Sequence, residues 1–573
     1  MKRRLFVANL PMLLAFLLPL NLHGQVREPD QALHEAMRHS DVQKLEDVTA
    51  GDSVNLADGS LVVRQTDVDL PGNSELPVRF SRRFNVSAGS GVMGLRAGFL
   101  EWEIELPRIR TTSADWINKS PTPHARCSVN DPVLTAPPNY TIGQAGDPSR
   151  WDAFPKDFWS APVLDTDSDS GQLLTPIETS LVPDDGGATR WVTRERSAIS
   201  CLPSILNGEG EGYVARTADG RTYRFDWMAR QLKFPLAPAM LPWLSLGRYE
   251  FSLYATRVED GLGNWVEYDY AQPTYTLPAE PHTGVRVTAI RASDGRRIEI
   301  TYDDRDLVRE VVANGRRWTY AYSSQGSLAS VLLPDGSSRV FDTTTNFGNI
   351  SAAPGRAGSC LSETSPLNER EYPYTMTEPS GLRTTFVIKA TLFGRSDVPR
   401  VCQTGGASAY LLNYPNYSLV RKTQSGPGMP ERTWSYSYTS AWGFSPFRGG
   451  ANTTVVTDPD GATTTYVYGN TNLIDDGLLL SEVRKDPGGA IVAEQHFSYG
   501  LPSGQIALRT GISPETRWGL QGAELYNRMQ HSEESIRPKL ETIRVQDGVT
   551  YVERLQEVDA MARPTKILHS TTP

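Results

Sequence analysis

The sequence predicts an all-β protein built as one repetitive, antiparallel ribbon of strands. A turn-closing glycine recurs, and apolar and aromatic residues alternate after it. Counted from that glycine, the third, fifth and seventh residues share one strand face, because side chains alternate with a period of two. In six copies the fifth and seventh residues are aromatic or Ile; the copies begin at Gly220, Gly263, Gly295, Gly315, Gly381 and Gly461. An ordinary antiparallel domain with a packed aromatic core is the alternative, and the shared register favours the repeat.

The residues before these glycines support tight turns. Asp or Asn precedes several of them, and these residue types favour the positive φ that such turns require. The preceding residues are Asp219, Asp294, Asn314 and Asp460. We therefore expect each glycine to close a turn and start a strand.

The N-terminus predicts export. Lys2, Arg3 and Arg4 precede an apolar run from Leu5 to Leu20 that is too short to cross a bilayer as a helix. We interpret residues 1–24 as a secretory signal peptide, with a short membrane anchor as the alternative, and residues 25–50 as a tether or short helix. The mature protein is then secreted, periplasmic or on the cell surface, and we expect no integral membrane span after signal removal.

Composition and cysteine content narrow the function classes further. The 573 residues carry a net charge of −9, which disfavours nucleic acid as a partner because nucleic acid requires a cationic face. An even number of cysteines in an exported chain suggests disulfides, and four cysteines allow three pairings. The most local choice is Cys127–Cys201 with Cys360–Cys402. Neither pair has the Cys-x-x-Cys spacing of a zinc or redox motif.

Two blocks of sequence resemble the bacterial Rhs/YD-repeat family. The first is the run Arg317-Trp318-Thr319-Tyr320-Ala321-Tyr322, followed by Gly326, Leu328, Val331, Pro334, Asp335 and Gly336. The second is an entry block with Val54-Asn55-Leu56-Ala57-Asp58-Gly59-Ser60-Leu61, Thr66-Asp67-Val68-Asp69-Leu70-Pro71-Gly72, Leu76-Pro77 and Arg83-Phe84-Asn85. The resemblance implies a β-ribbon that spirals into a hollow shell in exported toxin carriers and wall-associated proteins. Because this chain lacks the flanked Asp-Pro core motif and a toxin-like C-terminal domain, it resembles a partial shell without self-cleavage or toxin activity.

This resemblance and the composition together divide the chain. We expect an Rhs-type entry segment at 51–100, an inserted β-rich subdomain with many Trp, Pro and Asp residues at 101–215, and the YD-repeat ribbon at 216–500. Residues 501–573 form a degenerate C-terminal repeat region, with a possible helix at Glu515–Arg537.

One acidic loop has the pattern of a cation site. Asp165, Asp167 and Asp169 alternate before Gly171, and Ca²⁺ prefers several oxygen ligands. However, Gly171 is one place late for an EF-hand, and Pro176 replaces its terminal Glu. The alternatives are a calcium loop and a solvated acidic loop; we expect no other cofactor.

No pattern of catalytic residues is present. The eight histidines are scattered, and acidic pairs such as Asp303/Asp304 and Asp475/Asp476 are typical of turns. The sequence therefore predicts a non-enzymatic scaffold or shell segment whose partner is a toxin or a cell-surface component. The alternative is a secreted carbohydrate-binding or carbohydrate-active protein, with Trp116 and Trp159 as candidate glycan contacts.

Overall fold

In a computed structural model of the protein, the described residues form strands and turns without a helix. They are 51–86, 98–113, 125–128, 140–142, 151–153, 162–167, 171–176, 188–236, 246–273, 285–342, 369–398, 412–447, 449–471, 474–505 and 537–572. The expected signal peptide (1–24) and tether (25–50) lie outside these ranges, as does the expected helix (Glu515–Arg537) except for its last residue. Within them, no helix is long and apolar enough to cross a bilayer.

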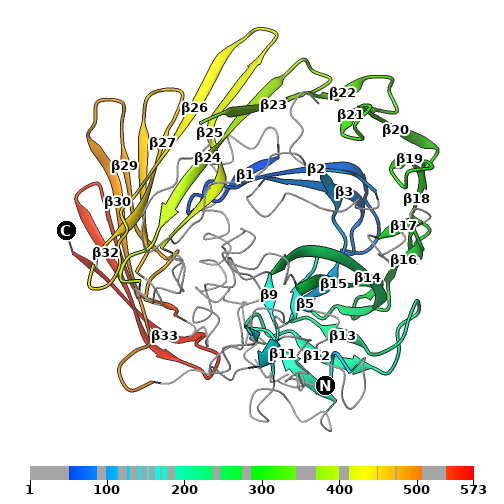
Figure 1. Cartoon of the computed structure of the whole chain (residues 1–573), viewed down its shortest axis with the longest axis horizontal. Coiled ribbons are helices and arrows are strands. Elements are labelled where there is room, and N and C mark those ends of the chain that lie inside the picture. Colours follow the sequence, from blue (N-terminus) through cyan, green and yellow to red (C-terminus); the bar gives the residue numbers. More distant parts are fainter. Residues whose placement is uncertain are drawn as a thin grey trace, which may run out of the picture.

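The ribbon is one curved sheet in which each strand from β10 to β33 pairs antiparallel with the next. Figure 1 shows these strands following one another around an open curve. The all-β ribbon predicted from the sequence is therefore confirmed. Its strands are β10 (Thr175–Pro176), β11 (Thr189–Val192), β12 (Ala198–Leu202), β13 (Gly212–Arg216), β14 (Thr222–Leu236), β15 (Leu246–Glu259), β16 (Trp265–Ala271), β17 (Arg286–Ala292), β18 (Arg297–Tyr302), β19 (Val308–Ala313), β20 (Arg316–Tyr322), β21 (Leu328–Leu332), β22 (Ser338–Phe341), β23 (Glu371–Thr377), β24 (Arg383–Gly394), β25 (Asn413–Gly426), β26 (Met429–Ser440), β27 (Ala451–Thr457), β28 (Thr463–Gly469), β29 (Leu479–Lys485), β30 (Ile491–Tyr499), β31 (Lys539–Gln546), β32 (Val549–Val558) and β33 (Pro564–Thr572).

The predicted turn glycines start the strands as expected. All six have positive φ, between +83° at Gly263 and +88° at Gly295 except for +72° at Gly315, and each precedes a ribbon strand. On β18 the alternation is complete: Ile298, Ile300 and Tyr302 are buried, while the residues that alternate with them are exposed. The local period of two therefore determines which face of the strand enters the core.

A second, four-stranded sheet lies inside the curve of the ribbon. Its strands are β1 (Asp52–Val54), β2 (Leu61–Leu70), β3 (Val78–Val86) and β4 (Trp102–Ile104), paired in that order. In Figure 1 this inner sheet, drawn in blue, crosses the space enclosed by the ribbon. Its apolar side chains and those of the ribbon form one hydrophobic core. The inner sheet therefore packs on the ribbon's concave face instead of adding a strand to its edge.

Aromatic rings join the two sheets across this core. Phe84 of β3 stacks on Tyr374 of β23 with ring centroids 4.7 Å apart, and Trp102 of β4 meets the edge of Phe341 of β22 at 5.5 Å. Such pairs add about 0.5–1.5 kcal/mol each beyond the area they bury. The inner sheet thus packs on ribbon strands that lie more than 200 positions later in the sequence.

Residues 101–215 contribute to several parts of the structure. β4 belongs to the inner sheet, and β10 to β13 begin the ribbon. A short branch of the sheet starts at β15. One edge of β5 (Arg108–Ser113) pairs with β15, and its other edge pairs with β8 (Val163–Asp165). β8 in turn pairs with β9 (Gln172–Leu173). The short strands β6 (Tyr140–Ile142) and β7 (Trp151–Ala153) form a separate parallel pair.

A disulfide joins Cys127 to Cys201 across 74 positions, which confirms one of the two pairs favoured from the sequence. Cys360 and Cys402 lie outside the described residues. Nearby, the indole Nε1 of Trp191 donates to the carbonyl of Cys127 at 2.8 Å, so the bridge is anchored to β11 as well as to β12.

Candidate functional site

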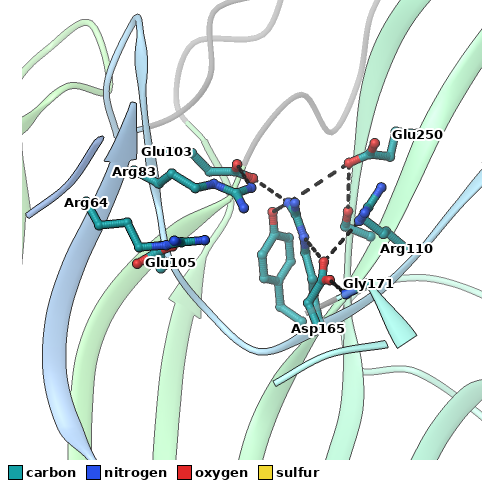
Figure 2. Close-up of polar contacts among 11 residues, drawn as sticks. Arg64, Arg83, Glu103, Glu105, Arg110, Asp165, Gly171 and Glu250 are labelled. Carbon is teal, nitrogen blue, oxygen red and sulfur yellow. Dashed lines mark hydrogen bonds and ion pairs between the residues drawn. The ribbon is translucent and has the colours of Figure 1, made fainter. Parts of the chain in front are cut away.

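The first of the predicted calcium ligands, Asp165, is held by two arginines. It ends β8, and its Oδ2 accepts from Nε of Arg108 at 3.3 Å and from Nε of Arg110 at 3.0 Å, both on β5 (Figure 2). Its Oδ1 accepts from the backbone N–H of Gly171 at 2.8 Å. Burial opposes ionisation of Asp165, but Arg110 and Arg108 outweigh it and keep its pKa below the ordinary value.

The second predicted ligand, Asp167, is in a different environment. Its backbone carbonyl accepts from Nη2 of Arg79 on β3 at 2.8 Å, while its Oδ2 is buried without a hydrogen-bond partner among the described residues. Burial raises the pKa of Asp167 to about 6, although the charges of Arg79 and Arg221 oppose this rise. Asp169 lies outside the described residues. Among those that are described, no three His, Cys, Asp or Glu side chains gather into a metal-binding group. The calcium loop stays a prediction.

Asp165 belongs to a larger polar cluster centred on Arg108. The Arg108 guanidinium also contacts Glu103 of β4, and its Nη1 lies 3.3 Å from Oη of Tyr254 and 3.9 Å from Glu250, both on β15. In Figure 2, the labelled Glu103 comes from the inner sheet, Asp165 from the branch and Glu250 from the ribbon. Burial acts against the charge of Arg108, but the carboxylates around it outweigh burial and hold its pKa well above the ordinary value. Each carboxylate is thereby matched to a permanent cation, and the cluster joins three parts of the fold.

A second polar cluster lies farther along the inner sheet, around Asp67 of β2. Its carboxylate accepts from Nε of Arg82 at 2.8 Å, from Oη of Tyr320 at 2.9 Å and from Nη1 of Arg339 at 3.1 Å. Arg339 also pairs with Glu378 at 2.8 Å. These contacts connect β2 and β3 with ribbon strands β20 and β22. Two anions and two cations balance one another there.

A third set of polar contacts anchors the tip of the inner sheet near β1. Nζ of Lys422 on β25 lies 2.8 Å from Oδ2 of Asp52, and both side chains are buried. Asn416 and Ser418, also on β25, donate to the carbonyl of Asp58 at 2.8 and 2.7 Å. Since the Asp58 acceptor is a backbone carbonyl, these two bonds fix the path of the chain and not only its side chains.

The hairpin between β2 and β3 is held by one arginine of the ribbon. Nη1 of Arg296 donates to the carbonyls of Leu70 and Leu76 at 2.9 and 3.2 Å, and its Nε pairs with Asp294 at 2.8 Å. Arg296 thus holds the two sides of the loop that joins β2 to β3. Its positive charge is neutralised by Asp294, which lies in the same turn as Arg296.

Glu101 is a half-buried acid at this interface, and none of the ion pairs among the described residues includes it. It precedes β4, and its Oε1 accepts from the backbone N–H of Leu328 on β21 at 2.8 Å. Its Oε2 is buried without a hydrogen-bond partner among the described residues. Burial raises the pKa of Glu101 to about 7, while its hydrogen bond from Leu328 and the charge of Arg82 act in the opposite direction.

The acidic pairs noted in the sequence serve turns where the structure describes them. Asp303 accepts from the backbone N–H groups of Arg305 and Leu307, both at 2.9 Å. Asp475 accepts from the N–H of Thr471 at 2.7 Å, and Asp476 pairs with Arg395 at 3.0 Å.

Sequence reasoning selected Asp165 and Asp167 but missed Asp67, Glu101 and Lys422. These three contribute single charges to long strands or turns, so no local spacing distinguishes them from solvent-exposed residues. Asp67 carries one weak indication of burial: it lies within β2, a strand in which most residues alternate between buried and exposed.

Comparison with known proteins gives structural overlaps only. No family model and no curated protein sequence matches this chain. The crystal structure of TcdB2-TccC3 overlaps 89% of this chain and 36% of its own, with TM-score 0.29 and 8% identity. The Photorhabdus luminescens Tc holotoxin pore overlaps 87% and 25%, with TM-score 0.28 and 10% identity. The N-terminal domain of effector protein SpvB from Salmonella typhimurium strain LT2 overlaps 68% and 98%, with TM-score 0.16 and 9% identity.

These overlaps are with toxin-complex and effector proteins, and the chain spans about a third of the TcdB2-TccC3 chain that it matches. TM-scores below 0.3 are too low to transfer a residue role, a partner or an activity.

Proposed function

We propose that this protein is an exported, non-enzymatic scaffold: a shell segment of YD-repeat type that works together with a toxin or a cell-surface component. The observation that carries the proposal is the ribbon, which curves around its own N-terminal sheet (Figure 1). The inner sheet packs on the concave face of the ribbon and so fixes the ribbon's curvature. A curved sheet of fixed shape is suited to supporting a partner molecule.

The polar groups between the two sheets support a structural role. Catalysis requires an acid, base or nucleophile held ready to meet substrate. Here Arg108 of β5 contacts Glu103 of the inner sheet, Arg339 of β22 contacts Asp67, and Lys422 of β25 pairs with Asp52. These charges hold the inner sheet against the ribbon.

The last ribbon strand supports the proposal of a partner. β33 pairs with β32 along its length. β5 is not available as a second neighbour of β33, because β15 and β8 occupy its two sides. Among the described strands, β33 therefore has one neighbour. Leu568 on β33 is 52% exposed, and such an edge offers backbone groups and apolar area to a further strand. We propose that a partner polypeptide extends the ribbon at this edge.

The experiment compares binding with catalysis in purified protein comprising residues 25–573. A scaffold is expected to resist limited proteolysis in the ribbon, to leave wall polysaccharides intact and to pass through a glycan column unretained. Glycan cleavage would overturn the proposal. Retention on the column that is lost in Trp116→Ala or Trp159→Ala would favour the carbohydrate-binding alternative.

The partner proposal has its own measurement. The protein encoded next to this one, co-expressed with it, is expected to slow amide exchange in β33 while leaving β18 unchanged. Exchange in β33 that is already as slow as in β18 without a partner would contradict a free edge.

A further inference from the structure

Around Asp67, where the inner sheet meets the ribbon, the described residues place one acid more than they place cations. Around Asp67, the carboxylates of Asp67 and Glu378 are matched by Arg82 and Arg339. Glu101 reaches the same junction from the segment before β4 and binds the N–H of Leu328 through Oε1. When Glu101 is ionised, the junction therefore carries a net negative charge away from solvent.

The surroundings of Glu101 compensate that charge only in part, because burial outweighs the Leu328 hydrogen bond and the charge of Arg82. Its second oxygen is buried and has no hydrogen-bond partner among the described residues. The titratable and charged groups that face it are Arg82 of β3, Tyr322 of β20 and Tyr374 of β23. Arg82 is already engaged by Asp67, and its guanidinium lies over the ring of Trp102 at 4.2 Å. A carboxylate that is ionised while one of its oxygens is buried without a hydrogen bond costs free energy, and binding a proton removes that cost.

We propose that Glu101 is a proton-controlled latch: its protonation holds the inner sheet on the ribbon, and its ionisation loosens that contact. The position of Glu101 makes the latch specific. It is next to β4, the last strand of the inner sheet, and it bonds directly to the first residue of β21. Opening this contact exposes Glu101 to water, where it ionises at its ordinary pKa.

The direction of the pH dependence follows from linkage. The pKa of Glu101 is about 7 in the closed state, against an ordinary value of 4.5. A raised pKa contributes stability that is fully present below about pH 4.5 and is lost as the pH rises toward 7. Between pH 5 and pH 8, the equilibrium constant for opening should rise on the order of 50- to 100-fold from this group alone.

Hydrogen exchange at several pH values tests the latch in the full mature chain. Protection of the β3 and β4 amides, corrected for intrinsic exchange rates, is compared with protection of β28, which the inner-sheet latch does not contact. In the unaltered protein we expect protection of β3 and β4 to fall on the order of 50-fold from pH 5 to pH 8 while β28 changes much less. Glu101→Gln, a neutral isostere, should keep the protection found at pH 5 throughout this range.

A neighbouring acid serves as the matched control. Glu105 is in the same segment but forms an outward ion pair with Arg64, with side-chain exposures of 30% and 49%. Glu105→Gln should retain the full pH dependence. Should Glu101→Gln fold poorly, Glu101→Met tests the same point, because it also lacks the proton-binding group. The proposal is overturned if β3 and β4 show no pH dependence, or if either Glu101 variant keeps the slope of the unaltered protein.

Discussion

Lys422 of β25 and Asp52 of β1 form a buried ion pair between residues that are 370 positions apart. Nζ lies 2.9 Å from Oδ1 and 2.8 Å from Oδ2, and the two side chains are 0% and 1% exposed. The ammonium group also lies 5.0 Å from the centroid of the Trp434 ring on β26. One lysine therefore ties the start of the inner sheet to the middle of the ribbon.

Removing the lysine should be costly. Lys422→Met leaves the Asp52 carboxylate buried without its cation, and we expect a loss of about 3–5 kcal/mol in the free energy of unfolding by urea denaturation. The double variant Asp52→Asn with Lys422→Met should recover part of that loss, because no uncompensated charge remains. Arg297→Met is the control: Arg297 pairs with Glu299 at the surface, with exposures of 54% and 53%, and its loss should cost about 1 kcal/mol or less. Equal effects of Lys422→Met and Arg297→Met would contradict a buried pair.

Gly59 should be intolerant of a side chain. It has φ of +72°, and a Cβ there would lie 2.4 Å from Cβ of Ser418 and 2.7 Å from Cζ of Tyr438. Gly315 has the same φ, and a Cβ there would meet no atom within 4 Å among the described residues. Gly315→Ala therefore measures backbone strain alone, about 1 kcal/mol. We expect Gly59→Ala to exceed it by about 2 kcal/mol in the same denaturation assay, because the tip of the inner sheet must move away from β25. Similar losses in both variants would show that the inner sheet tolerates displacement.

The disulfide should make a large contribution to stability. Cys127 and Cys201 close a loop of 74 positions, and a cross-link of that length contributes about 4 kcal/mol in the chain-entropy model. The variant with both cysteines changed to Ala should show this loss in oxidising buffer. A reducing agent should lower the stability of the unaltered protein by at least as much. Unfolding that is insensitive to reductant would show that this bridge does not limit stability.

The calcium prediction is tested by thermal unfolding with calcium and with excess chelator. Any ion bound by Asp165 and Asp167 must compete with Arg108 and Arg110, which already hold Asp165. If the loop binds calcium, 100-fold excess over Kd should stabilise the protein by about 2.7 kcal/mol, and Asp169→Asn should remove that effect. An unchanged Tm in chelator would leave the acidic loop as a structural element held by arginines.

The turn-and-strand units are local and were predictable from sequence. Gly295 and the buried Ile298 and Ile300 fall within a few residues of one another, and a period of two fixes which side chains share a face whatever the rest of the chain does. The same local signal located the turns at Gly220 and Gly461.

The interface between the sheets was decided by tertiary structure. Asp67 meets Tyr320 and Arg339, and Lys422 meets Asp52, only because the ribbon curves back over the inner sheet. Whether a single charged residue is buried or exposed depends on what packs over its strand, and that information is hundreds of residues away. The alternation that follows each glycine therefore determined the strands of the ribbon. The position of the inner sheet against the ribbon, and the burial of its acids, depended on long-range packing that no local pattern encodes.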